Sequence, residues 1–115
     1  MKNLAASRKN INRVVLTAKE HPDCIGPKFG LLVYRTNLPV PQVAEALGVT
    51  KATVYRWFFA TCDVSDENKV LVVKLGKAIT RAYKDNTLPV YGSLSDRVAV
   101  LDSILKGVDL GQHND

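Results

Sequence analysis

Apolar residues recur at intervals of three and four along most of this chain, which is the spacing that gathers them on one face of a helix. In the first segment, Leu4, Ile11 and Val15 follow this spacing with basic and polar residues between them. We therefore predict an all-α fold, a compact bundle of five to six helices. The predicted helices cover residues 1–20, 28–36, 40–47, 50–59, 65–84 and a last segment from residue 93.

Prolines and glycines separate the predicted helices. The segment His21–Pro27 holds two prolines and one glycine, so it is predicted to be a loop. Gly26 and Gly30 are interpreted as chain breakers. Ser65 is predicted to be the N-cap of the longest later helix. We expect four apolar residues of that helix to face the core: Val70, Val73, Ala78 and Ile79.

The two short helices predicted between residues 40 and 59 organise the chain. Gly48 lies between them and can adopt the left-handed conformation that ends a helix. Thr50 can cap the second helix by accepting a hydrogen bond from a backbone N–H. Ala44 is small enough to let two helices joined by so short a turn cross closely. The residues predicted to face the core are Val43, Ala44 and Leu47 in the first helix and Val54, Trp57 and Phe58 in the second.

This pair resembles the DNA-binding helix-turn-helix of small bacterial and bacteriophage regulators. The resemblance rests on the positions of Ala44, Gly48, Val49, Val54 and Trp57. It implies that Thr50–Phe59 is a recognition helix for the major groove of double-stranded DNA, with Val40–Leu47 crossing above the backbone. Trp57 and Phe58 are bulkier than the aliphatic residues usual in this family. They require additional packing surface from another part of the chain.

The outward face of the second helix carries donors and acceptors suited to DNA. Arg56 is predicted to bind guanine bidentately, while Ala52 or Thr53 contacts a thymine methyl group. Lys51 and Tyr55 are predicted to hold phosphates. A structural alternative, that these are ordinary exposed residues, stays open. The predicted DNA-binding residues are Gln42, Thr50, Lys51, Ala52, Thr53, Tyr55 and Arg56, with Gln42 placed near a helix N-terminus that favours anions.

The net charge of +5 is unevenly distributed. Residues 1–84 hold 14 basic and 6 acidic side chains, a net +8, whereas residues 85–115 hold 2 and 5, a net −3. A basic surface attracts polyanions, because neutralised phosphates release counterions. Basic helical stripes are also common as solvated surface, and both interpretations stay open. The candidate phosphate contacts are Arg8, Lys9 and Arg13 in the first helix and Lys74, Lys77 and Arg81 in the fifth.

The last segment carries an apolar seam at four-, three- and four-residue spacing. The seam is predicted either to form a homodimer or to pack on its own domain, and the sequence favours neither. We predict a single domain over residues 1–108 and a flexible tail over residues 109–115. The seam residues are Leu94, Val98, Leu101 and Leu105.

The function expected from this pattern is sequence-specific binding of double-stranded DNA by a bacterial or bacteriophage transcription regulator. One alternative is the small terminase-type subunit of a DNA-packaging machine. Another is a helical module that binds a protein, such as RNA polymerase, through Tyr55, Trp57 and Phe58. That module requires an exposed aromatic patch, whereas a DNA-binding helix requires a buried Trp57.

The sequence gives little support for catalysis, metal binding or a membrane span. No phosphate-binding glycine loop, HExxH motif or nucleophile signature is present, so we expect no enzyme and no cofactor. His21 and Cys24 lack a second pair of metal ligands. Cys24 and Cys62 could pair, but free thiols are the default expectation in a reducing cytoplasm. No apolar run is long enough for a membrane span. The expected location is the cytoplasm, that of the bacterial host if a phage encodes the protein.

Overall fold

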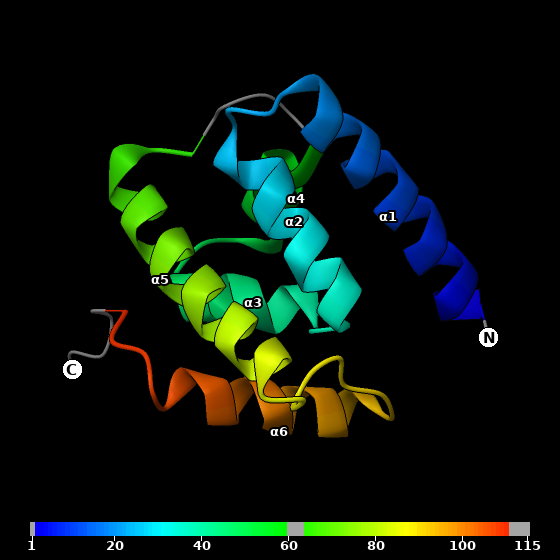
Figure 1. The fold of residues 1–115 in the computed structure, drawn as a ribbon, viewed down its shortest axis with the longest axis vertical. Helices are drawn as coiled ribbons and strands as arrows, with labels where there is room; N and C mark the ends of the chain where they lie inside the picture. Colours follow the sequence, from blue (N-terminus) through cyan, green and yellow to red (C-terminus); the bar gives the residue numbers. More distant parts are fainter. Residues whose placement is uncertain (1, 60–63, 111–115) are drawn as a thin grey trace.

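A computed structural model of the chain describes residues 2–59 and 64–110, with side chains from residue 11 onward. These residues form six α-helices and no strand, which confirms the predicted all-α class (Figure 1). Within the described ranges, none of the helices has the length and apolar character needed to cross a bilayer. The helices are α1 (Lys2–Glu20), α2 (Ile25–Thr36), α3 (Val40–Leu47), α4 (Lys51–Phe59), α5 (Asp66–Lys84) and α6 (Leu94–Leu105).

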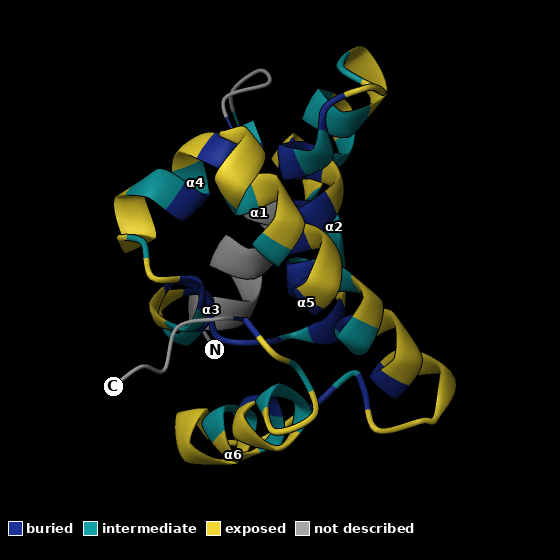
Figure 2. Ribbon diagram, turned by 90° about the vertical axis from the view of Figure 1, so that its left-hand side faces the viewer, coloured by how far each residue is buried: buried dark blue, intermediate teal, exposed yellow. Residues whose placement is uncertain are grey.

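Helix α2 is the central support of the fold, because α1, α4 and α5 all pack against it. In Figure 1, α4 lies behind α2 and α1 runs along one side of the molecule. Figure 2 shows the bundle from a perpendicular direction, with α3 and α4 on one side and α2 and α5 on the other. The pair α3 and α4 therefore occupies one face of the molecule, and the α2–α5 contact occupies the opposite face.

Helix α2 begins at Ile25, three residues before its predicted start. Pro27 lies in the first turn, where a backbone N–H has no partner inside the helix and its absence costs nothing. The prediction of a loop through Pro27 and of Gly26 and Gly30 as chain breakers is wrong, because both glycines lie within the helix. Their role is to let another helix approach closely.

The two glycines bring α2 into close contact with α4. A Cβ added at Gly26 would collide with the backbone oxygen of Trp57. A Cβ added at Gly30 would lie 2.7 Å from ring carbons of Phe58 and 2.9 Å from a methyl carbon of Val14. Since α2 presents bare backbone at these points, α4 can carry two large aromatic residues and still lie against it.

Helix α5 packs with a different face from the one predicted. Val70 and Val73 are exposed rather than buried, whereas Ile79 is buried as expected. The apolar run from residue 70 to residue 73 covers all sides of the helix, so its own spacing cannot fix which side packs. The buried side is set by residues at three- and four-residue spacing along the whole helix: Val72, Leu75, Ile79 and Ala82.

Helix α6 packs on α5 and α3. Ser93 and Asp96 form a capping box at its start, with the Ser93 Oγ accepting from the Asp96 N–H at 3.1 Å. Leu101 has no exposed surface and belongs to the core of its own chain, so this central seam residue is not available to a second copy. The homodimer itself stays a prediction.

The first two residues of the predicted tail, Asp109 and Leu110, contact the bundle, and the flexibility of the tail stays a prediction. Leu110 is buried against the core, and Lys74 Nζ donates to the Asp109 backbone oxygen at 3.3 Å. These contacts hold the chain against α5 through residue 110. Residues 111–115, the remainder of the predicted tail, lie outside the described residues.

Candidate nucleic-acid interface

The turn between α3 and α4 is built by local hydrogen bonds around Gly48. Gly48 has φ of 74° and ψ of 24°, the left-handed conformation predicted from the sequence. The Gly48 N–H donates to Glu45 O and the Val49 N–H donates to Ala44 O, both at 3.1 Å. Together these bonds form a Schellman motif, which satisfies two carbonyl groups at the end of α3. The sharp turn predicted at this position is therefore confirmed.

Thr50 fixes the start of α4. Its hydroxyl accepts from the Thr53 N–H at 3.1 Å and lies 2.9 Å from the Thr53 hydroxyl. The first bond is the predicted N-cap, and the second pairs the two side chains with each other. Both threonines thus hold defined positions at the N-terminal end of α4.

The inner face of α4 is fully packed. Val54 and Phe58 have no exposed surface, and Trp57 is 4% exposed. The Phe58 ring meets Phe29 and Tyr34 of α2 in edge contacts, with centroid distances of 6.2 and 5.4 Å. These contacts supply the packing surface that the bulky residues require. They also remove the exposed aromatic patch that the protein-binding alternative needs at Trp57 and Phe58.

The outer face of α4 is accessible. Figure 2 shows exposed positions along the side of α4 that faces away from the rest of the bundle. Thr53 and Tyr55 are half-buried, and the Tyr55 ring packs against Phe58 and Phe59. The predicted contact residues that are exposed are Thr50, Lys51, Ala52 and Arg56.

Gln42 lies on α3 and is only partly exposed. Its Oε1 atom is enclosed and has no hydrogen-bond donor among the described residues. A buried acceptor without a donor costs about 1–3 kcal/mol, so the fold gains no stability from this amide. The opposite end of the amide, Nε2, is the donor that a phosphate oxygen requires.

Arg13 of α1 is placed beside the C-terminal end of α4. Its guanidinium carbon lies 4.3 Å from the centroid of the Phe59 ring, a cation–π contact. This contact positions an exposed cation next to the aromatic end of α4. The sequence predicts no role for Phe59, because nothing in the spacing shows that α1 crosses α4 there. The side chains of Arg8 and Lys9, the other predicted contacts in α1, lie outside the described residues.

The cations predicted on α5 do not join this surface. Lys77 and Arg81 border the space between α2 and α5, on the opposite side of the molecule from α4. Lys74 donates a hydrogen bond to the Asp109 backbone oxygen. All three side chains are exposed, but DNA held by α4 would lie on another face.

Tyr34 lies under the aromatic cluster of α4, and its hydroxyl has no partner among the described residues. Burial, and secondarily the nearby Tyr55, raise the pKa of Tyr34 to about 12, while Arg13 acts in the opposite direction. The neutral phenol is therefore favoured in the folded protein. Tyr34, Tyr55 and Arg13 thus lie together where α1, α2 and α4 meet.

Cys24 precedes α2 and is disulfide-bonded, so the expectation of a free thiol is wrong for this residue. The chain contains one other cysteine, Cys62, which lies outside the described residues. Its spacing from Cys24 carries no signature, and the expectation of free thiols rested on the assumed compartment rather than on geometry. Among the described residues, no group of three or more histidine, cysteine or acidic side chains is arranged to hold a metal ion.

No protein-family model matches this chain, and neither a curated protein nor a solved structure does. Its function must therefore be argued from the geometry of its own surfaces. The α3–α4 pair and the exposed face of α4 are the most defined of these.

Proposed function

We propose that this chain binds double-stranded DNA sequence-specifically by inserting α4 into the major groove, as a bacterial or bacteriophage transcription regulator does. The observation that carries the proposal is the division of α4 into two faces. Val54, Trp57 and Phe58 fix the helix to the bundle, and the opposite face offers Arg56 and Lys51 to solvent. A helix held rigidly on one side and bare on the other suits insertion into a groove.

The dimensions of α4 fit this role. The diameter of a helix with its side chains, about 10–12 Å, fits the major groove, which is about 12 Å wide, and the nine residues of α4 extend about 13 Å along the helix axis. The Gly48 turn places α3 across the start of α4, where its Gln42 amide can reach a phosphate. Arg13 adds a cation beside the other end of α4. The donors thus extend along the whole length of the proposed recognition helix.

The first test is a selection of random double-stranded oligonucleotides by the full chain at two salt concentrations. Sequence-specific binding should enrich one motif at both concentrations, since base contacts depend less on salt than phosphate contacts do. Enrichment without a shared motif, or loss of all binding at the higher salt, would leave only charge attraction and refute the proposal.

The second test uses Arg56→Ala on the selected site, with Arg81→Ala as the matched control. Arg56→Ala should weaken binding by about 1–3 kcal/mol and relax the preference at one base pair. Arg81→Ala removes the same charge from the opposite side of the molecule and should leave the affinity nearly unchanged. Equal weakening by both variants in a fluorescence anisotropy titration would show that α4 does not read the DNA.

A further inference from the structure

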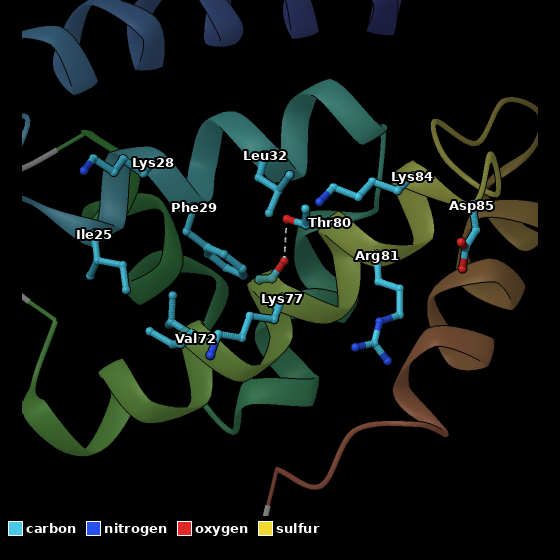
Figure 3. A pocket seen from close by; sticks show the side chains of 12 residues that line it. Ile25, Lys28, Phe29, Leu32, Val72, Lys77, Thr80, Arg81, Lys84 and Asp85 are labelled. Carbon is cyan, nitrogen blue, oxygen red and sulfur yellow. Dashed lines mark hydrogen bonds between the residues drawn. The ribbon is translucent and has the colours of Figure 1, made fainter.

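A groove of about 580 Å³ lies between α2 and α5, on the face opposite α4. Figure 3 shows Phe29 and Leu32 of α2 pointing toward α5 across this groove. Ile25, Val72 and Val73 complete an apolar lining. The groove lies open along its length rather than closing around a cavity, so it suits an elongated occupant more than a small molecule that must be enclosed.

The border of the groove is strongly basic. Lys28 lies at one end and Lys84 at the other (Figure 3), and Lys77 and Arg81 also belong to the lining. Asp85 is the one acidic residue among the lining residues. An occupant with apolar residues on one side and acidic residues beside them would match both the lining and the border.

Gly76 lies in the middle of α5 and faces the groove. A Cβ added there would meet its nearest neighbours, Leu32 and Phe29, at 4.0 Å, which is ordinary contact. Glycine costs about 1 kcal/mol relative to alanine inside a helix, and no packing among the described residues requires it at this position. Bare backbone in a groove lets the backbone of a second helix approach closely.

The groove is long enough for about four helical turns. Its lining on α5 runs from Val72 to Asp85, a rise of about 20 Å. Val73 in the lining is 41% exposed, and Val70, which lies one turn before it on α5, is 55% exposed. Thr80 lies one turn after Gly76, and its hydroxyl donates to the Gly76 backbone oxygen at 2.9 Å. The centre of the groove is therefore lined by small residues.

We propose that this groove binds an amphipathic acidic helix of a partner protein. The apolar face of that helix would lie on Ile25, Leu32 and Val73, which are partly or fully accessible, with its carboxylates against the lysines at the border. A second copy of this chain fits poorly, because a two-fold contact would place the same cations against each other. The acidic C-terminal segment, residues 85–115, offers no substitute, since α6 buries Leu101 in the core of its own chain.

The test is binding of a fluorescein-labelled peptide of about 16 residues to the full chain, measured by fluorescence anisotropy. The peptide carries leucine at alternating three- and four-residue spacing and glutamate on the flanking positions. A scrambled peptide of the same composition is the control. We expect one-to-one binding of the amphipathic peptide alone, weakening as salt is raised.

Four variants locate the site. Gly76→Leu fills the centre of the groove and should weaken peptide binding at least tenfold, and Lys84→Glu should weaken it several-fold. Lys106→Glu makes the same charge change at the residue that follows α6, outside the groove, and should have no effect. Gly76→Ala, which has room for its methyl group, separates filling of the groove from misfolding: it should melt no lower than the wild type and bind at an intermediate level.

Several results would overturn the proposal. They are absence of binding, equal binding of the scrambled peptide, or unchanged affinity in Gly76→Leu. Self-association of the wild type in sedimentation that Gly76→Leu abolishes would also overturn it, because it would make a second copy the occupant. None of these results bears on DNA binding by α4, which is measured separately with Arg56→Ala.

Discussion

Gly30→Ala measures how closely α2 approaches α4. The added methyl carbon would lie 2.7 Å from two ring carbons of Phe58 and 2.9 Å from Val14. Neither side chain has any exposed surface, so neither can turn away into solvent. Overpacking of this kind costs about 1–3 kcal/mol, and two fixed neighbours place it at the upper end. The higher helix propensity of alanine stabilises the fold by about 1 kcal/mol, so we expect the free energy of unfolding to fall by about 2 kcal/mol in total.

The matched control is Gly76→Ala, which makes the same change in another helix interior. The nearest atoms to its methyl group lie at 4.0 Å, so only the gain in propensity remains. For a chain of this size, 1 kcal/mol shifts the melting temperature by about 4 °C. We expect Gly30→Ala to melt about 8 °C below the wild type and Gly76→Ala about 4 °C above it, followed by circular dichroism at 222 nm.

Opposite signs for the same substitution are the informative result. If Gly30→Ala melted at or above the wild type, α2 would not lie against Phe58 as described, and the support proposed for α4 would be wrong. A loss of stability in both variants would instead show that glycine is needed in these helices for a reason unrelated to space. Urea denaturation gives an independent measure of the free energy of unfolding.

Three further changes test other parts of the molecule. Gln42→Met removes a buried acceptor that has no donor, so it should raise the melting temperature. It should also weaken binding to every DNA sequence equally, and a loss of preference at only one base pair would contradict a phosphate contact. The pKa of Tyr34 is raised to about 12 in the folded protein, so the free energy of unfolding should fall as pH rises from 10 toward 12. Tyr34→Phe should lessen that fall in urea titrations, and an identical fall in this variant would exclude Tyr34 as its source. Leu101→Lys should unfold the monomer rather than separate two copies, and a folded, monomeric variant in sedimentation and circular dichroism would return Leu101 to a dimer seam.

The local features of the candidate site could be predicted from the sequence. The left-handed Gly48, the Thr50 cap and the Ser65 cap depend on the conformational preferences of one residue and on bonds to atoms three to five positions away. The existence of each helix follows from three- and four-residue spacing in the same way. Neighbours in the chain are enough to decide such features.

The tertiary structure decided which face of each helix packs and which residues from distant segments meet. The apolar run at the start of α5 fits the core in more than one rotation, and only the packing of α5 in the folded bundle leaves Val73 exposed. From the sequence alone Gly30 is interpreted as a chain breaker, and only the folded chain shows that it makes room for Phe58. The apolar seam of α6 is equally consistent with a dimer contact, and only the folded chain shows that Leu101 belongs to the core. The groove between α2 and α5 joins residues more than 40 positions apart. Spacing along one helix records that a face is apolar but not what covers it, because the covering atoms belong to other segments that only the folded chain brings together.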